Sequence, residues 1–176
     1  MLDAAGVDYE ARKPDVDESA VKARLADPVQ IASELAAAKA LSVDGDGWAI
    51  GSDSVVCVDG QLFDKPQDRD QAAEHLRLFS GRVMELTSAV ALAHVGKVDW
   101  QHAETARLKV RALSETFIRE YLDAEWPEVG YCVVVFRLEG RGVQLFERID
   151  GDYFAILGMP LLPLLGALRE RGLLGS

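Results

Sequence analysis

Apolar residues recur at helical spacing in four stretches of the chain. In residues 28–41, Ile31, Leu35 and Ala38 fall on one helix face, and alanine fills most of the other positions. The same spacing predicts further helices over residues 68–79, 114–125 and 161–173. The last of these is strongly apolar, and we expect it to pack on the core rather than to anchor the chain in a membrane.

Runs of β-branched and apolar residues between turn signals predict strands. Residues 48–58 are expected to form a strand that is interrupted at Gly51–Ser54, and Asp59-Gly60 is typical of a hairpin turn. Further strands are expected over residues 84–95, 104–110, 131–138 and 143–150. Helices and strands do not strictly alternate, which favours an α/β or α+β fold with some antiparallel pairing.

Length and composition are those of a globular protein. The 176 residues, 49% hydrophobic and 27% charged, are enough for one domain or two closely packed lobes. The first twenty residues carry acids throughout and no apolar run, so we expect no signal peptide and a cytoplasmic protein. Cys57 and Cys132 lack the spacing of a zinc site or a disulfide framework, and both are expected to be buried, reduced thiols.

The net charge of −10 argues against some classes of binding partner. Nineteen Lys and Arg against 29 Asp and Glu repel long polyanions, which argues against nucleic acids and anionic membranes as partners. A small anion can still bind where a few cations dominate locally. Lone basic residues beside Gly-rich or acidic motifs are therefore the candidates for a binding site.

Asp53 and Lys65 are the first candidates for chemistry. Asp53 interrupts an apolar strand and is flanked by small residues, and a buried carboxylate is costly unless it is paired or binds a metal. The alternative is an aspartate that caps a turn at the end of the strand. Pro66 fixes the backbone after Lys65 and could aim the ammonium inward, whereas a solvated loop lysine is the ordinary alternative.

Other polar residues are weaker candidates. Lys39 lies at the end of a helix, where a cation also favours the helix dipole. The acidic cluster Asp15, Asp17 and Glu18 could hold a divalent cation through hard oxygen ligands, or could simply be solvated. The three histidines have no recognisable serine or cysteine partner, so a covalent triad has little support.

Taken in order, these pieces resemble the Maf family of nucleotide pyrophosphatases, and the resemblance covers nearly the whole chain. Each motif is weak alone, but the ordered set is specific. The matching segments are Pro14–Glu18, Ala37–Ala40, Gly51–Val56, Asp59-Gly60, Lys65-Pro66, Ser80-Gly81, Leu138–Gly140, Leu145–Arg148 and Gly158–Leu161.

The resemblance implies a fold and an activity. The fold is a Maf/ITPase-like α/β structure, with a mixed, strongly twisted sheet and helices forming two lobes around a central cleft. The activity is hydrolysis of a nucleoside triphosphate to a nucleoside monophosphate and pyrophosphate, with Mg²⁺ or Mn²⁺ as cofactor. The resemblance also implies a small-molecule nucleotide partner and a homodimer, whereas the acidic net charge is the reason to expect no nucleic acid polymer and no membrane as partner.

The resemblance assigns roles to residues. Asp53 matches the catalytic aspartate that accepts a proton from water, and Lys65 is expected beside it at the reacting end. Glu18 and Asp53 are the expected metal ligands. Lys39 matches a polar residue of the cleft and is expected to bind substrate. Water needs a carboxylate or metal to become a nucleophile, and developing phosphate charge needs a cation, which agrees with these roles.

Selection of the base resembles a split between family members that act on dTTP and UTP and members that act on 7-methyl-GTP. The discriminating positions here are Ser54 and Glu139, both expected to bind substrate. A carboxylate at Glu139 suits a cationic methylated guanine, whereas Ser54 matches neither group. We therefore expect a modified or purine nucleotide, with dTTP and UTP as the competing substrates.

Two departures from the family pattern affect this expectation. The family opens with a strand and a Ser-x-Ser-x-x-Arg-Arg phosphate loop, and Met1–Gly6 matches the helix after that loop. Residues 1–176 are thus expected to form a single Maf-like domain without that strand and loop. Each charge-assisted hydrogen bond so lost costs about 1.5 to 3 kcal/mol in phosphate binding. Gly130–Val135, directly before Phe136, also stands where the family has a small-residue stretch near the base, which affects the expected substrate. The alternative function is a non-catalytic nucleotide-binding regulator of cell division.

Overall fold

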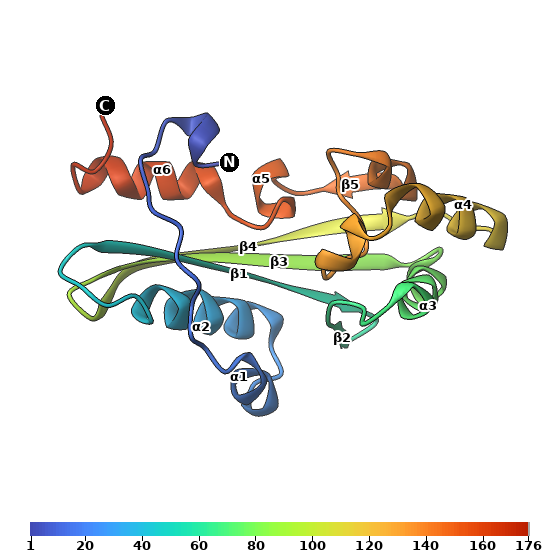
Figure 1. The fold of residues 1–176 in the computed structure, drawn as a ribbon, viewed down its shortest axis with the longest axis horizontal. Helices are drawn as coiled ribbons and strands as arrows, with labels where there is room; N and C mark the ends of the chain where they lie inside the picture. Colours follow the sequence, from blue (N-terminus) through green and yellow to red (C-terminus); the bar gives the residue numbers. More distant parts are fainter. Residues whose placement is uncertain (176) are drawn as a thin grey trace. The chain divides into compact units, whose positions relative to one another are not determined.

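The computed structural model describes residues 1–175 and divides them into two compact units, which are described one at a time. The first unit comprises residues 1–54, 87–105 and 152–175, and the second comprises residues 55–86 and 106–151. A five-stranded sheet has the order β2-β1-β3-β4-β5 (Figure 1). Its strands are β1 (Trp48–Val58), β2 (Gln61–Phe63), β3 (Val83–His94), β4 (Lys97–Val110) and β5 (Phe146–Asp150). The predicted mixed α/β fold is confirmed.

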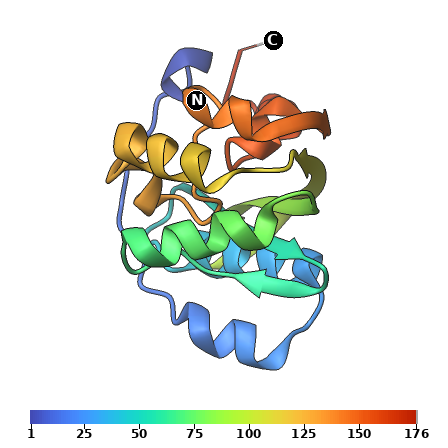
Figure 2. The ribbon, with the colours of Figure 1, turned by 90° about the vertical axis from the view of Figure 1, so that its right-hand side faces the viewer.

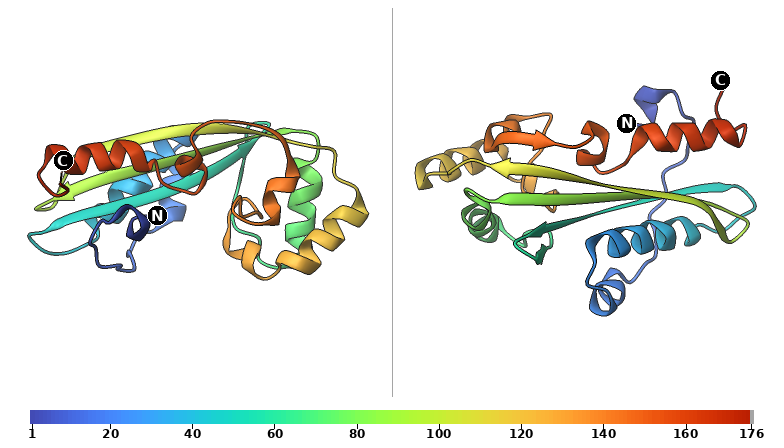
Figure 3. Two further views of the ribbon diagram at one scale, coloured as in Figure 1. Left: turned by 90° about the horizontal axis from the view of Figure 1, so that it is seen from above. Right: turned by 180° about the vertical axis from the view of Figure 1, so that it is seen from behind.

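In the first unit, helices cover both faces of the sheet. Helix α2 (Pro28–Leu41) follows the short α1 (Glu18–Arg24) and has the bounds that the apolar spacing predicts. Helix α6 (Leu161–Glu170) follows the single-turn α5 (Tyr153–Ile156). Figure 3 shows α2 and α6 on opposite faces of this part of the sheet.

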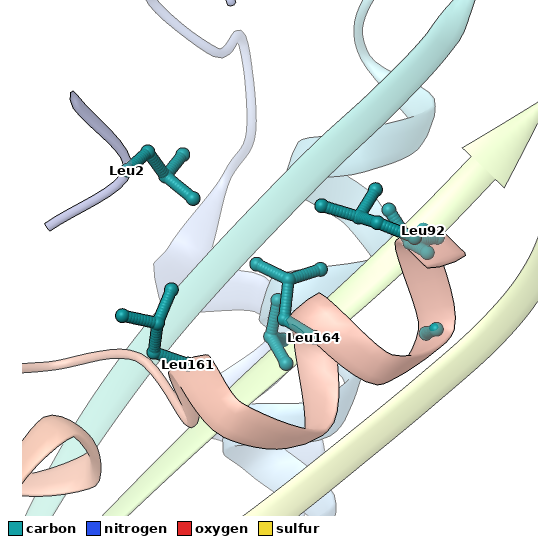
Figure 4. Close-up of a cluster of buried hydrophobic side chains, with 7 residues drawn as sticks. Leu2, Leu92, Leu161 and Leu164 are labelled. Atoms are coloured by element: carbon teal, nitrogen blue, oxygen red, sulfur yellow. The ribbon is translucent and has the colours of Figure 1, made fainter. Parts of the chain in front are cut away.

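The core on the α6 side joins the two ends of the chain. Leu161 and Leu164 pack with Leu92 of β3 and with Leu2, which precedes the 3-10 helix η1 (Asp3–Ala5) (Figure 4). This burial confirms that the apolar C-terminal helix packs on the core. The helix ends at Glu170, earlier than predicted, and Gly172 follows in the left-handed conformation with φ +68°. Among residues 1–175, no helix combines the length and the apolar composition that crossing a membrane requires.

Strand β1 is continuous, and the predicted interruption at Gly51–Ser54 is wrong. Gly51 lies directly against α2, because a Cβ atom on it would come within 2.1 Å of the Ala36 carbonyl oxygen. The glycine therefore serves the contact between helix and strand, not a break in the strand. Ser52 and Ser54 on the opposite face hydrogen-bond to neighbouring segments, so these polar residues are compatible with a strand interior.

The second unit packs two helices side by side. Helices α3 (Arg69–Phe79) and α4 (Glu115–Glu125) begin after Asp68 and Ser114, whose side chains accept the capping hydrogen bonds. Figure 2 shows the two helices next to each other. The ion pairs that join them are Arg77 with Glu115 and Arg69 with Asp123. Both helices were predicted, and each begins one residue later than predicted and ends where predicted.

Two tight turns join neighbouring strands, and the sequence indicated only one of them. Asp59-Gly60 forms the expected turn between β1 and β2, with φ +51° and +81°, and pairs Val58 with Gln61. Val95-Gly96 adopts the same left-handed pair of conformations, at +48° and +69°, between β3 and β4. Valine is a poor residue for this conformation, which is why the second turn gave no signal.

The predicted strand over residues 131–138 is wrong. The 3-10 helix η2 (Glu128–Tyr131) is followed by turns, and Val135 has φ +53°, which is incompatible with an extended strand. The Tyr121 hydroxyl donates to the Val135 carbonyl oxygen at 3.1 Å and so supports this conformation. The next predicted strand, 143–150, begins only at Phe146, because the 3-10 helix η3 (Arg141–Leu145) occupies its first part.

Candidate functional site

Asp53 lies in the middle of β1, and its side chain faces helix α2. Side chains alternate between the faces of a strand, so Asp53 shares the face of Gly51, on which α2 packs closely. Only 9% of the Asp53 side chain is exposed. The alternative of an aspartate that caps a turn at a strand end is therefore wrong.

Lys39 and Glu18 meet Asp53 from the two neighbouring helices. Lys39 extends from the last turn of α2, and its Nζ lies 2.5 Å from Asp53 Oδ1 and 2.9 Å from Glu18 Oε1. Glu18 is in the first turn of α1, which Asp17 caps by accepting a hydrogen bond from the Ala20 amide. The structure thus brings together three residues that are far apart in sequence: a buried carboxylate, an ammonium and a half-exposed carboxylate.

The acids of the cluster Asp15, Asp17 and Glu18 have different roles in the structure. Asp17 is used as a helix cap and also accepts a hydrogen bond from the Ser19 hydroxyl at 2.6 Å, and Asp15 is exposed. Of the three acids, Glu18 contacts Lys39, which in turn contacts Asp53. The cap explains the arrangement, because it fixes the start of α1 and hence the direction of the Glu18 side chain.

Burial and ion pairing have opposite effects on the pKa values of Asp53 and Lys39 in this triad of Glu18, Lys39 and Asp53. Burial raises the pKa of Asp53, and the adjacent Lys39 ammonium offsets only part of that effect. Burial lowers the pKa of Lys39, but its hydrogen bonds and charge interactions with Asp53 and Glu18 outweigh it, so the net shift is upward. Lys39 therefore remains a cation, and Asp53 is a more basic carboxylate than an exposed aspartate.

The hydroxyls of Ser52 and Ser54, on the face of β1 opposite Asp53, form hydrogen bonds to neighbouring segments. The Ser52 hydroxyl lies 2.8 Å from the Gly158 carbonyl oxygen and 2.9 Å from that of Ala89. Ser88, which is fully buried in β3, donates to the Ala155 carbonyl oxygen at 2.7 Å, so it accepts a hydrogen bond from the Ser54 hydroxyl at 2.6 Å. The backbone on both sides of Asp53 is thus held to β3 and to the segment after α5.

Sequence reasoning missed Ser88. It lies in the predicted strand over residues 84–95, and its only signal is that Thr87 and Ser88 interrupt a long apolar run. Such an interruption indicates a polar contact in the core, because a buried hydroxyl needs a hydrogen-bond partner. The identity of that partner, Ser54, depends on the pairing of β1 with β3.

Glu18 and Asp53 supply oxygen ligands of the kind that Mg²⁺ or Mn²⁺ prefers. Across residues 1–175, no three or more His, Cys, Asp or Glu side chains converge as a complete metal cage. Glu18 and Asp53 instead offer two carboxylates around one ammonium, which is itself a cation held by both. Mg²⁺ is commonly bound through one or two carboxylates, with waters and substrate phosphates completing the coordination, so these residues fit the metal.

A cavity of about 640 Å³ opens beside the triad within the first unit. Lys39 and Ser52 line it, as do Trp48 and Ile50 farther along β1 and Arg12 of the N-terminal segment. The volume falls in the range of small-molecule sites. The lining combines apolar side chains with two cations, Lys39 and Arg12, and three acids, Asp8, Glu10 and Asp44. Arg12 is paired with Glu10, so Lys39 is the cation at the end of the cavity nearest Asp53.

The remaining candidates belong to the second unit. Lys65 is exposed, and its charge acts with that of Arg137 on the half-buried Cys132. Burial nevertheless raises the pKa of the Cys132 thiol, which keeps it protonated at neutral pH. Glu139 is exposed in the turn before Gly140. Cys57 is buried, as expected, whereas Cys132 is only half-buried.

Comparison with known proteins gives a consistent result along the chain. The sequence profile of the family described as "Maf-like protein" matches residues 1–171. A "7-methyl-GTP pyrophosphatase" of Rhizobium meliloti (strain 1021) is 44% identical over 98% of this chain and 90% of its own length. A "Nucleoside triphosphate pyrophosphatase" of Nitrobacter hamburgensis (strain DSM 10229 / NCIMB 13809 / X14) is 44% identical over 99% and 89%. With a family match over residues 1–171 and relatives of this identity and coverage, the chain belongs to the Maf family.

Proposed function

We propose that the protein is a nucleotide pyrophosphatase that hydrolyses the bond between the α and β phosphates of a nucleoside triphosphate. Water adds across the anhydride, and a nucleoside monophosphate and pyrophosphate leave. The observation that carries this proposal is the contact of one ammonium, on Lys39, with both Asp53 and Glu18. The names of the Rhizobium and Nitrobacter relatives support the same reaction.

Each residue of the site has a role in this proposal. Asp53 accepts the proton of the attacking water, and the raised pKa that burial gives it makes it a better base than an exposed aspartate. Lys39 binds the substrate phosphates, and Lys65 stabilises negative charge that develops at the reacting end. Glu18 and Asp53 hold a Mg²⁺ or Mn²⁺ ion, which when bound would polarise the phosphate oxygens.

The preferred substrate in this proposal is 7-methyl-GTP. Relatives from Rhizobium meliloti and Brucella suis biovar 1, the latter 41% identical over 97% of this chain, carry that substrate in their names. Glu139 is an exposed carboxylate that suits the positive charge of a methylated guanine. We assign Ser54 to substrate binding as well, as the family resemblance implies, although its hydroxyl lies on the face of β1 opposite Asp53 and contacts Ser88. A cytoplasmic location and a homodimer complete the proposal.

The decisive experiment measures pyrophosphate release from a panel of nucleotides with Mg²⁺ or Mn²⁺. The panel contains 7-methyl-GTP, GTP, dTTP and UTP. We expect turnover to be fastest with 7-methyl-GTP, and Asp53→Asn to reduce it about 10² to 10⁴-fold. Asp46→Asn is the matched control, because Asp46 is exposed in the loop before β1 and should leave the rate unchanged. Equal rates for Asp53→Asn and the unmodified protein would refute the proposal.

The same panel separates hydrolysis from regulation by binding. A non-catalytic regulator would bind nucleotides in calorimetry and release no pyrophosphate over hours. Binding without release in the unmodified protein would favour that second class of function. Release that depends on Asp53 would exclude it.

A further inference from the structure

The Lys39 ammonium occupies a position that both carboxylates of the site can reach. It lies 2.5 Å from Asp53 Oδ1 and 2.9 Å from Glu18 Oε1, so these two oxygens are at most 5.4 Å apart, the sum of the two distances. Two oxygens on opposite sides of an octahedral Mg²⁺ are about 4.2 Å apart. From the upper limit of 5.4 Å, a change of about 1.2 Å in the separation reaches that spacing. Glu18 can supply it, because 46% of its side chain is exposed.

We propose that the ammonium of Lys39 holds the position of the divalent cation, and that the cation displaces it. This inference rests on the proposed function and places the metal between Glu18 and Asp53. The charge of Lys22 also acts on Asp53. Once Lys39 has left, Glu18, Asp53 and Lys22 together carry a net charge of −1, which attracts a divalent cation. An ammonium and a divalent cation within a few ångströms repel each other strongly in a partly buried site, so the two exclude one another.

The cavity beside the site can accommodate the displaced Lys39 side chain. Lys39 lines the cavity that runs along β1 beside Ser52. Its side chain is a flexible four-carbon stem with a compact charge, so it can leave the carboxylates by rotation about single bonds. In the cavity the ammonium can contact phosphate oxygens of a ligand. Binding of the metal and release of Lys39 toward the phosphates are therefore two parts of one exchange.

The exchange makes a prediction about metal affinity in the absence of nucleotide. Removal of the competing ammonium in Lys39→Met should strengthen Mn²⁺ binding at least about tenfold, measured by calorimetry and by the electron paramagnetic resonance signal of free Mn²⁺. Lys39→Arg keeps a cation and should not gain affinity. Adding Asp53→Asn to Lys39→Met should abolish the gain. Lys97→Met is the control for net charge, because Lys97 is exposed on β4 and its removal changes the total charge equally.

Several outcomes would overturn the inference. These are equal or weaker Mn²⁺ binding by Lys39→Met, an equal gain in Lys97→Met, or no measurable binding by any variant. If thermal unfolding shows that Lys39→Met is not folded, Lys39→Gln takes its place with the same expectation. Pyrophosphate release by the unmodified protein without the affinity gain would reject the exchange alone. The affinity gain without pyrophosphate release would reject the proposed function alone.

Discussion

Gly51 in β1 packs against Ala36 in α2 with no space for a side chain between them. A Cβ atom on Gly51 would lie 2.1 Å from the Ala36 carbonyl oxygen and 2.4 Å from the Ala40 amide nitrogen. Both are backbone atoms inside a helix and cannot move alone. The contact sets the separation of α2 from the strand, and so the reach of Lys39 to Asp53.

Substitution of this glycine should therefore harm both stability and activity. Gly51→Ala forces α2 away from β1, and we expect it to lower the free energy of unfolding by about 3 kcal/mol or more and to weaken hydrolysis. Urea unfolding and the pyrophosphate assay measure the two effects. Gly47→Ala is the matched control, since a Cβ atom there meets nothing within 4 Å. Similar unfolding curves for the two variants would contradict the close packing.

Ser88 should be coupled energetically to Ser54. Ser88→Ala leaves the Ala155 carbonyl and the Ser54 hydroxyl short of a partner in the core, and we expect a loss of about 1 to 3 kcal/mol in unfolding free energy. Ser54→Ala removes the same contact. The double variant should therefore lose less than the sum of the single variants, as urea unfolding of all three would show. Strict additivity would mean that the two hydroxyls do not interact.

The turn at Val95 offers a stabilising substitution. Val95 is 58% exposed and has φ +48°, a conformation that β-branched residues disfavour and that asparagine tolerates. We expect Val95→Asn to raise the free energy of unfolding by about 1 kcal/mol, measured by thermal and urea unfolding. Val95→Thr is the control, because threonine is polar but retains the branched Cβ. An equal gain in both variants would attribute the effect to polarity rather than to the backbone.

His75 should make stability depend on pH. Its Nδ1 atom is buried with no hydrogen-bond partner, and burial lowers its pKa below the ordinary 6.5. The unfolded chain therefore takes up a proton more readily than the folded protein as the pH falls through 6.5. The stability associated with neutral His75 is full above pH 6.5 and is lost on acidification.

His75→Phe tests this dependence. The phenyl ring keeps the contacts of the imidazole with Phe63 and Phe79 and removes the titrating group. We expect the loss of unfolding free energy between pH 7 and pH 5 to be smaller in His75→Phe than in the unmodified protein. Urea unfolding at the two pH values gives both slopes. The same slope in both proteins would show that His75 is not the group responsible.

Glu139 should decide between charged and neutral bases. If it faces a methylated guanine, Glu139→Gln removes one charge and should reduce kcat/KM for 7-methyl-GTP about tenfold relative to GTP. The ratio of the two substrates is the measurement, because a general loss of stability affects both equally. Glu147→Gln, at another exposed carboxylate, serves as the control. An unchanged ratio would remove Glu139 from base selection.

Sequence signals that act within a few residues were sufficient to predict several local elements. Helices α2, α3 and α4 and the Asp59-Gly60 turn follow from apolar spacing, capping residues and turn chemistry, all of which act between near neighbours. The ordered motifs also indicated the family and selected Asp53, Lys39 and Glu18 as candidates. The predictions failed where distant contacts override local preference, as at the continuous β1 and at residues 131–138.

Which of the candidate residues meet depends on contacts between distant parts of the chain. Asp17 and Glu18 are adjacent acids with the same local signal, yet one caps a helix and the other reaches Lys39. The difference arises because the close contact of α2 with Gly51 and the start of α1 fix positions in space that no local pattern encodes. Burial of Asp53, and with it the direction of its pKa shift, likewise depends on the helix that packs over it.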